Sequence, residues 1–201
     1  MSTARQRVAL YGGSFNPPHM GHVLIATWAV TAQGDGRLRF DQTRLVPTLG
    51  HPFAKELAPF ATRVAMVEAA VGHLGPRVKV DPIEGRLPAP SYTIDTINAL
   101  LAAEPELELT WLMGADAWRD RMKWKAWDEL WALLEGRVLV VGRGEDLPSD
   151  APAAGFALPP FSSTAVREAV RAGKPYDWMV PEGVAAIIAR DGLYRAGAGT
   201  P

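Results

Sequence analysis

The sequence predicts an α/β fold in which a doubly wound, mainly parallel sheet carries helices on both faces and is followed by a small C-terminal helical segment. Short β-type runs alternate with segments of helical spacing, which is typical of a parallel sheet. The run RVLVV, Arg137–Val141, is apolar after its first residue, as expected for a strand buried on both faces. No internal repeat or long linker divides the chain. We therefore expect one domain over residues 1–195 and a fraying tail over 196–201.

The β-type runs are short and separated by regular intervals. They are Arg7–Tyr11, Thr43–Pro47, Arg77–Val80, Leu107–Met113 and Arg137–Val141. Helical spacing fills the segments between them, which are Met20–Gln33, Pro59–Leu74, Ser91–Ala103 and Ala126–Leu134. The stretch from Gly142 to Pro160 is rich in proline and glycine, so we expect a loop there, with one short strand near Phe156–Leu158. Ser162–Ala172 and Pro181–Arg190 are expected to form two closing helices.

Composition excludes several classes of protein. The 201 residues include no cysteine, so neither disulfides nor a thiolate metal site can form. A formal net charge of −1 argues against nucleic acid or a membrane surface as a partner. We find no apolar run of membrane-spanning length, and Met1–Arg7 lacks the apolar core of a signal peptide. These features together predict a cytoplasmic protein.

The stretch YGGSFNPPHMGH, Tyr11–His22, follows the first strand directly. Gly12 and Gly13 would let the backbone approach an anion, and a helix starting near His19 would offer unpaired N–H groups at the carboxyl end of a strand. His19 and His22 are three residues apart, so they share one face of the first helical turn. The pattern predicts a phosphate site. Zinc binding is disfavoured because His51 and His73 lie far off in the sequence.

A second stretch, FSSTAVREAV, begins at Phe161. Alone it would be an ordinary helix start, with Ser162, Ser163 and Thr164 at the N-cap and Arg167 on the surface. Together the two stretches resemble the signatures of the HxGH nucleotidyltransferases, which have a Rossmann-like fold. The resemblance implies that the second stretch forms another clamp for the β- and γ-phosphates of ATP.

Three further segments resemble the nicotinate and nicotinamide mononucleotide adenylyltransferases of that superfamily. They are RLPAPSYTIDTINAL from Arg86, LMGADAWRDRMKWKAWDEL from Leu112, and RDGLYR from Arg190. The matches run over nearly the whole chain in collinear order.

The resemblance implies roles for individual residues. His19, His22 and Arg167 would be catalytic. The ATP site would contain Gly12, Gly13, Ser14, Phe15, Gly114, Asp116, Arg143, Ser162, Ser163 and Thr164, with Gly114 and Asp116 at the adenosine ribose. The mononucleotide site would contain Lys55, Ser91, Tyr92, Thr93, Trp124 and Trp127. A flat aromatic side chain can stack on the pyridine ring. Trp127 fits the core equally well, and Lys55 and Arg143 also fit exposed surface positions.

The sequence departs from the bacterial nicotinate enzymes at Ser14 and Asn16, where threonine and aspartate are usual. The run from Gly50 to Lys55 also differs from the family's Asn-x-Pro-Pro-His-Lys. Backbone N–H groups and hydroxyls around Ser91–Thr93 would favour an acceptor-only carboxylate. We therefore expect a preference for nicotinate mononucleotide rather than exclusion of the nicotinamide form.

The implied reaction joins nicotinate mononucleotide to ATP and releases pyrophosphate, with Mg²⁺ bound mainly through the ATP phosphates and no metal site formed by the protein. Three alternatives remain open. The acceptor could be nicotinamide mononucleotide, the enzyme could be of the pantetheine-phosphate adenylyltransferase or cytidylyltransferase type, or the protein could bind nucleotides without catalysis. The tryptophan-rich segment Trp118–Trp131 could form the interface of a homo-oligomer.

Overall fold

The computed structural model describes residues 5–31, 33, 36, 39–50 and 57–196. Within these residues, six strands form one sheet in the order β3-β2-β1-β4-β5-β6, and every neighbouring pair is parallel. The strands are β1 (Gln6–Gly13), β2 (Gln42–Pro47), β3 (Val78–Val80), β4 (Leu107–Gly114), β5 (Val138–Arg143) and β6 (Ala153–Leu158). The chain runs outward from β1 to β3, then crosses back to β4 and continues to β6. This is the doubly wound arrangement predicted from the sequence.

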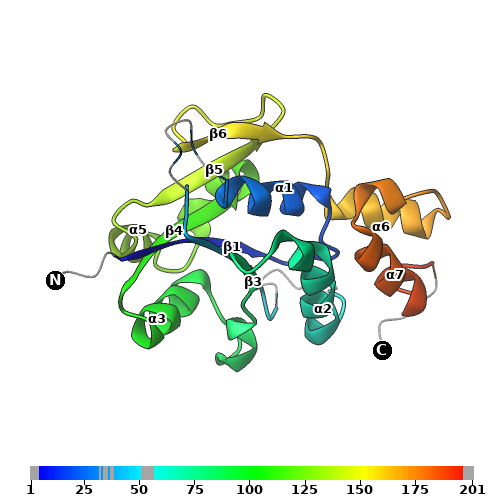
Figure 1. The fold of residues 1–201 in the computed structure, drawn as a ribbon, viewed down its shortest axis with the longest axis horizontal. Helices are drawn as coiled ribbons and strands as arrows, with labels where there is room; N and C mark the ends of the chain where they lie inside the picture. The colour runs from blue at the N-terminus through cyan, green and yellow to red at the C-terminus, as the bar shows by residue number, and fades with distance from the viewer. Residues whose placement is uncertain (1–4, 32, 34–35, 37–38, 51–56, 197–201) are drawn as a thin grey trace.

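The helices lie between and after the strands (Figure 1). The α-helices are α1 (Met20–Ala29), α2 (Phe60–Val71), α3 (Thr93–Ala103), α4 (Ala115–Arg119), α5 (Trp127–Leu133), α6 (Ser163–Arg171) and α7 (Glu182–Arg190). Short 3-10 helices form at η1 (Gly72–Leu74), η2 (Ile83–Arg86), η3 (Arg121–Lys123) and η4 (Asp177–Met179). None of the helices in the described segments is long and apolar enough to cross a bilayer.

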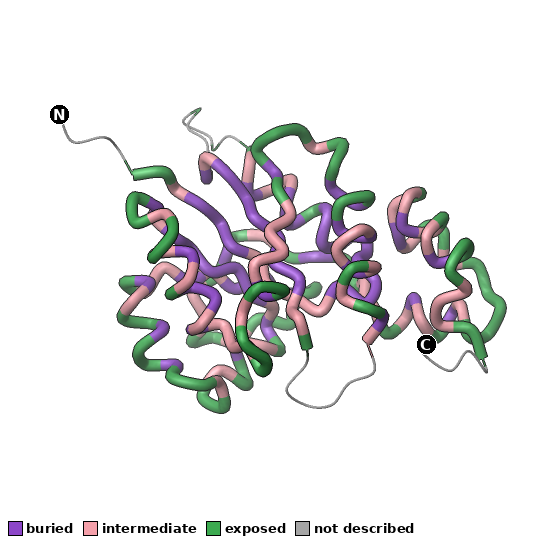
Figure 2. Tube along the Cα trace, turned by 90° about the horizontal axis from the view of Figure 1, so that it is seen from below, coloured by how far each residue is buried: buried purple, intermediate pink, exposed green. Residues whose placement is uncertain are grey.

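The central strand β1 contributes to the core on both of its faces. Val8 and Leu10 pack with residues of α3 and α5, while Ala9 between them packs with α1. This alternation follows from the two-residue period of a strand. Figure 2 shows the buried strands enclosed by helices whose outer residues are exposed. α6 and α7 follow the sheet, and α7 packs on α2.

The predicted helices are confirmed to within three residues at each end, except for the first. It ends at Ala29 and not at Gln33, because the N–H groups of Val30 and Thr31 bond to carbonyls three residues back, each at 3.2 Å. That tighter turn closes the helix, and the two β-branched residues do not favour its continuation.

The stretch Gly142–Pro160 holds a longer strand than predicted. β6 spans six residues, Ala153–Leu158, and buries Ala154 and Leu158. Four of its six residues are alanine or glycine, and it is an edge strand of the sheet, so its pattern is weak. The short helices α4, η2, η3 and η4 have too few residues to show a helical period and are absent from the prediction.

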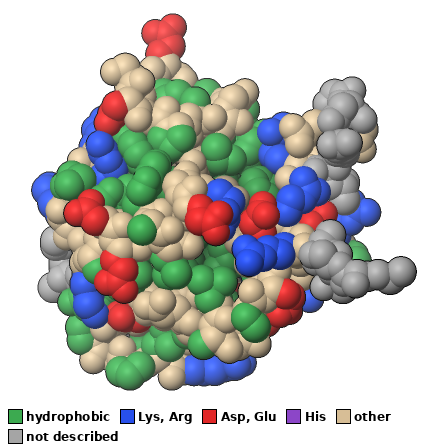
Figure 3. Space-filling model, turned by 90° about the vertical axis from the view of Figure 1, so that its left-hand side faces the viewer, with side chains coloured by type: hydrophobic (Ala, Val, Ile, Leu, Met, Phe, Trp, Pro, Cys, Tyr) green, Lys and Arg blue, Asp and Glu red, His purple; other side chains and the backbone are tan. Residues whose placement is uncertain are grey.

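Acidic and basic side chains are interspersed on the face of the molecule that Figure 3 shows. This distribution agrees with the near-zero net charge and offers no broad field of one sign on that face.

Candidate active site

A cavity of about 400 Å³ opens at the carboxyl ends of β1 and β4. These strands lie where the chain reverses its direction across the sheet, which is the usual ligand position in doubly wound folds. The lining residues are Gly12, Gly13, Ser14, Thr48, Gly50, Glu84, Ser91, Tyr92, Thr93, Trp111, Met113, Gly114, Ala117, Lys123, Trp124 and Lys125. The structure therefore brings together the predicted glycine loop, Gly114, which is predicted to contact the ribose, and most of the predicted pyridine pocket.

The glycine loop is shaped by aromatic neighbours. A Cβ on Gly12 would lie 2.4 Å from the Trp111 ring, so only glycine fits at this position. Phe15 has a φ of 44° and is 1% exposed. Its ring packs edge-on against Tyr11 at 5.8 Å and against His22 at 4.9 Å. The Phe15 side chain thus supports the histidine from inside the protein and does not line the cavity.

The two histidines of the motif form a stacked pair at the start of α1. Their ring centroids lie 3.7 Å apart at an interplanar angle of 26°. The backbone N–H of His19, the N-cap residue, donates to Nδ1 of His22 at 2.9 Å. A Cβ on Gly21 would lie 2.9 Å from the His19 ring, which explains the glycine between them. Neither ring lines the cavity, and both are nearly covered, His22 being 8% exposed.

The environment keeps both histidines neutral. Burial, with a smaller effect of the Arg143 charge, lowers the pKa of His19 to about 3. Burial likewise holds the pKa of His22 well below its usual value, with further lowering by His19 and Arg143. Since Nδ1 of His22 accepts a hydrogen bond, the single proton of the neutral ring must sit on Nε2. His22 is therefore prepared as a neutral Nε2–H donor.

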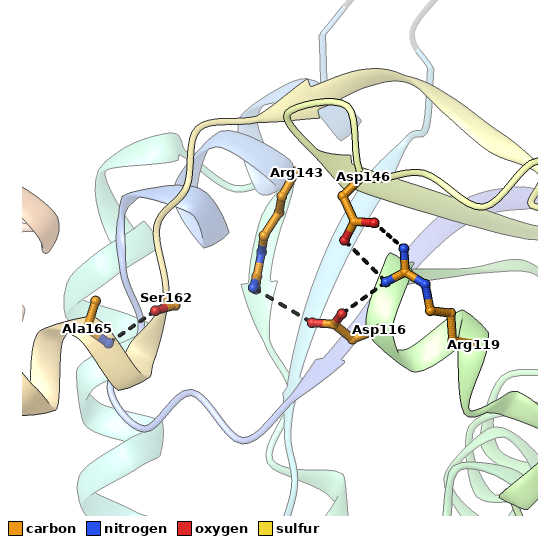
Figure 4. Close-up of polar contacts among 6 residues, drawn as sticks. All are labelled: Asp116, Arg119, Arg143, Asp146, Ser162 and Ala165. Atoms are coloured by element: carbon orange, nitrogen blue, oxygen red, sulfur yellow. Dashed lines mark hydrogen bonds and ion pairs between the residues drawn. The ribbon is translucent and has the colours of Figure 1, made fainter.

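The late motif packs directly on the early one, although about 150 residues separate them in sequence. The Ser163 hydroxyl donates to the carbonyl of Pro17 at 2.8 Å, and Arg167 donates to the carbonyl of Asn16 at 2.7 Å. A second guanidinium nitrogen of Arg167 lies 3.2 Å from Oγ1 of Thr164. The Ser162 hydroxyl accepts from the Ala165 N–H at 3.1 Å and caps α6 (Figure 4). The helix start predicted at Ser162 is confirmed, and its N-terminus lies beside the histidine loop.

Arg143 and Asp116 come from neighbouring strand ends. Arg143 is the last residue of β5, and Asp116 lies in the first turn of α4, just after β4. Arg143 Nη1 lies 3.9 Å from a carboxylate oxygen of Asp116 (Figure 4). The same arginine is close enough to affect the pKa values of both histidines. The two histidines, Arg143 and the Asp116 carboxylate thus share one electrostatic environment.

Aromatic side chains form the other end of the cavity. Trp124 lines it, with its ring edge-on to Trp111 at 6.4 Å and to Trp127 at 6.0 Å. Trp127 is 8% exposed, belongs to the core and is not among the lining residues. Trp127 therefore supports Trp124 from behind. The side chain of Lys125 lies over the Tyr92 ring, with Nζ 4.6 Å from the ring centroid.

The sequence reasoning missed Glu84, a carboxylate in the cavity wall that is 4% exposed. Its oxygens accept from the Leu49 N–H and the Ser91 hydroxyl, both at 2.9 Å, and from the Thr96 hydroxyl at 3.2 Å. Burial raises the pKa of Glu84, while these hydrogen bonds and the charge of Arg63 oppose the rise. Glu84 fixes the Ser91 side chain within the predicted pyridine pocket, and nothing in its local sequence indicates this.

Arg63 was missed as well. It is 1% exposed and donates to the carbonyls of Ser14, Leu49 and Ala58 at 2.8 to 3.0 Å. An arginine on the buried face of α2, between apolar positions, is the signal that would have revealed it. It joins the glycine loop to the segment after β2. Lys55 and His51 lie outside the described residues.

The C-terminal RDGLYR segment also reaches the motif loop. The Tyr194 hydroxyl donates to the Asn16 side-chain oxygen at 2.8 Å, and the same oxygen accepts from the Ala58 N–H at 3.0 Å. Asn16 thus connects three parts of the chain that are distant in sequence.

Comparisons with known proteins agree with this geometry. The cytidylyltransferase-like family model matches residues 10–169. A protein of Anaeromyxobacter sp. (strain K) named "Probable nicotinate-nucleotide adenylyltransferase" is 37% identical over 204 residues, covering 97% of this chain and 100% of the relative. A protein of the same name from Geobacillus kaustophilus is 36% identical, covering 96% of this chain and 88% of the relative.

A solved structure shows the same fold. The nicotinic acid mononucleotide adenylyltransferase of Plasmodium falciparum, complexed with NaAD, superposes with a TM-score of 0.77 at 17% identity. The alignment covers 94% of this chain and 97% of the parasite protein. As the sequence motifs predicted, this chain belongs to the cytidylyltransferase-like family and, within it, to the group of the nicotinate-nucleotide adenylyltransferases.

Proposed function

We propose that this protein transfers the adenylyl group of ATP to nicotinate mononucleotide, forming the deamido dinucleotide and pyrophosphate for NAD biosynthesis. The observation that carries the proposal is the composition of the site at the ends of β1 and β4. At one end of the cavity lies the glycine loop, with the paired histidines and the N-terminus of α6 beside it. At the other end lies an aromatic pocket that carries hydroxyl groups. This combination suits a phosphate chain beside a flat heterocycle.

In the proposed reaction an oxygen of the mononucleotide phosphate attacks the α-phosphorus of ATP in line. The bond from that phosphorus to the oxygen bridging to the β-phosphate breaks, and pyrophosphate leaves with the electron pair. The nucleophile is already an anion, so no protein base is required. Catalysis then depends on positioning and on donors directed at the developing charge.

Each residue has a role in this reaction that follows from its chemistry. His22 donates through Nε2–H to the α-phosphate, and Gly12–Ser14 present the loop backbone to the phosphates. The N-terminus of α6 and Arg167 bind the departing pyrophosphate. Arg167 lies close enough for this role because it also donates to the Asn16 carbonyl, in the loop that leads to the histidines. His19 orders this arrangement through its stacking and its backbone N–H, and it offers a second imidazole to the phosphates.

The acceptor occupies the aromatic end in this proposal. Trp124 and Tyr92 flank the pyridine ring, while the backbone N–H groups of Ser91 and Thr93 and the Thr93 hydroxyl meet its carboxylate. Glu84 lines the same cavity, but its oxygens already accept three hydrogen bonds. It is therefore committed to orienting the pocket and does not select an amide.

When bound, Mg²⁺ would supply positive charge to the ATP phosphates, and we expect it to be held mainly through them and not by protein side chains. Within the described parts of the chain, no three His, Asp or Glu side chains cluster to hold an ion by themselves. The donors near the histidines fit phosphate oxygens and not a cation, so the protein binds the metal as part of the nucleotide.

The cytoplasm is the compartment that we propose, in keeping with a chain without cysteine. An oligomer interface on the tryptophan-rich segment could use Trp131 and Met122, which are exposed, because Trp118 and Trp127 are buried and Trp124 lines the cavity.

A pyrophosphate-release assay with a panel of substrates tests the function. ATP and CTP are compared as donors, and the acceptors are nicotinate mononucleotide, nicotinamide mononucleotide, phosphopantetheine and a sugar phosphate. We expect turnover with ATP and a pyridine mononucleotide and little with the other pairs. Turnover with CTP, or with phosphopantetheine in place of a pyridine nucleotide, would reject the proposal.

A further inference from the structure

Arg119, at the end of α4, holds two carboxylates at once (Figure 4). Its Nη1 donates to Asp116 and to Asp146, each at 3.2 Å, and its Nη2 bonds the other oxygen of Asp146. The guanidinium thus forks onto Asp146 and shares one nitrogen with Asp116. None of the sequence motifs singled out this arginine.

The two carboxylates belong to different strand ends. Asp116 lies just after β4, whereas Asp146 lies in the turn that follows β5. That turn is tight, because the Asp146 N–H donates to the Arg143 carbonyl at 3.0 Å and Gly144 has a φ of 58°. Holding the Asp146 side chain therefore fixes the backbone that carries Arg143.

The same contacts set the balance of charge around Asp116. Its carboxylate has two cationic neighbours, Arg119 at 3.2 Å and Arg143 at 3.9 Å. Arg119 is the nearer one and bonds one carboxylate oxygen, while Arg143 lies beyond hydrogen-bond distance of the other oxygen. Asp116 therefore holds Arg143 only loosely. The charge of Arg143 lies close enough to the two histidines to lower the pKa of both.

We propose that Arg119 is a positioning residue for ATP. By binding Asp116 and Asp146 together, it joins the ends of β4 and β5, orients Asp116 toward the ribose and leaves Arg143 available to the phosphates. The inference rests on the proposed function, because it assigns these contacts to the nucleotide half of that site. Arg119 and its two partners are absent from the lining of the cavity, although Gly114 and Ala117 on either side of Asp116 line it, so Arg119 acts on the nucleotide only through Asp116 and Asp146.

The chain offers a matched control in Arg121. Its Nη2 bonds Asp150 at 2.8 Å, so it also joins the segment after β4 to the connection between β5 and β6. Arg121 contacts Trp118 through the backbone carbonyl and the ring face. It has no ion pair with Asp116 and does not hold the turn of Arg143. Loss of Arg121 should therefore affect folding stability without affecting the nucleotide.

The test measures equilibrium binding of α,β-methylene-ATP by calorimetry, and KM and kcat for both substrates. Arg119→Ala should weaken binding of the analogue about fivefold, equivalent to about 1 kcal/mol and at the upper end for an exposed ion pair. We expect KM for ATP to rise in parallel, while KM for the mononucleotide stays within about twofold. Arg119→Lys should restore part of the affinity, because an ammonium keeps the charge but not the fork.

Two further variants sharpen the result. Asp146→Asn should reproduce part of the loss, and the double variant should lose little more than Arg119→Ala alone, since Arg119→Ala already removes the Arg119–Asp146 contact. Arg121→Ala should bind the analogue like the parent protein. Unchanged binding in Arg119→Ala, or equal weakening in Arg121→Ala, would overturn the inference. The binding arm needs no acceptor, so a parent protein that makes no dinucleotide would reject the proposed function separately.

Discussion

Replacement of His22 separates its structural contact from its proposed catalytic one. Nδ1 accepts the backbone N–H of His19, and Nε2–H is the donor left for the α-phosphate. Asparagine places its side-chain oxygen the same number of bonds from the backbone as Nδ1, so His22→Asn keeps the first contact and loses the second. His22→Ala loses both. The two variants should therefore differ in stability and agree in activity.

The expected losses of stability and activity follow from the contacts that each variant removes. His22→Ala leaves the His19 N–H without its acceptor and removes the ring that packs 4.9 Å from Phe15. We expect its free energy of unfolding to fall by about 2–3 kcal/mol, of which the lost cap accounts for about 1 kcal/mol. His22→Asn should lose about 1 kcal/mol or less. Both variants should lose on the order of a hundredfold in kcat, or about 3 kcal/mol of transition-state stabilisation.

Pyrophosphate release at saturating ATP and mononucleotide gives kcat, and urea unfolding gives the stability. The decisive variant is His22→Asn, because its fold should be nearly intact. Turnover within about threefold of the parent would refute the assignment of Nε2–H as a donor to the transition state. A loss of activity that followed stability across the two variants would refute it equally.

Three other predictions follow from the same geometry. Arg167→Lys cannot span the Asn16 carbonyl and a phosphate at once, so KM for ATP should rise and kcat should fall; unchanged ATP kinetics would assign Arg167 to the surface. Trp124→Ala should raise KM for the mononucleotide with little loss of stability, whereas Trp127→Ala should lower the free energy of unfolding by about 3–5 kcal/mol. Kinetics and urea unfolding that showed the reverse pattern would contradict the assignment of Trp124 to the pocket. The folded pKa of His19 lies near 3, below its unfolded value of 6.5, so the unfolded chain binds the extra proton and stability should fall as the pH drops through that window. The slope should approach about 1.4 kcal/mol per pH unit for each histidine of the pair, and a flat urea-unfolding profile between pH 7 and 5 would exclude the buried neutral state.

The sequence predicted the sheet because its signals are local and repeated. β1 and β5 each contain four consecutive apolar residues, β4 ends in the apolar run Trp111–Met113, and the glycine loop with two histidines marks the strand–helix junction by itself. The weak signals belonged to β6, an edge strand in which four of six residues are alanine or glycine, and to helices of three to five residues. In those segments tertiary packing decides the structure and leaves little trace in the pattern.

The residues of the candidate site also differ in how far the sequence predicts them. Residues with a distinctive motif, such as His22 and Trp124, could be named as candidates from the sequence. Glu84 and Arg63 were missed because each acts through hydrogen bonds to residues distant in sequence, and only Arg63, between the apolar positions of α2, has a local signal of burial. Trp127 shows the opposite case, since its spacing from Trp124 suited either pocket or core and only packing placed it in the core.

Side-by-side kinetics with nicotinate mononucleotide and nicotinamide mononucleotide, at fixed saturating ATP and Mg²⁺, test the central claim most directly. Backbone N–H groups at the start of α3, with the Thr93 hydroxyl, complement a carboxylate better than an amide, while the Ser91 hydroxyl already donates to Glu84. We predict dinucleotide and pyrophosphate in equal amounts, and a kcat/KM at least about tenfold higher for the nicotinate form, or roughly 1.4 kcal/mol of discrimination. Equal efficiency, or a higher kcat/KM for the amide, would contradict the assignment of the pocket, and the absence of dinucleotide with either acceptor would contradict the function itself.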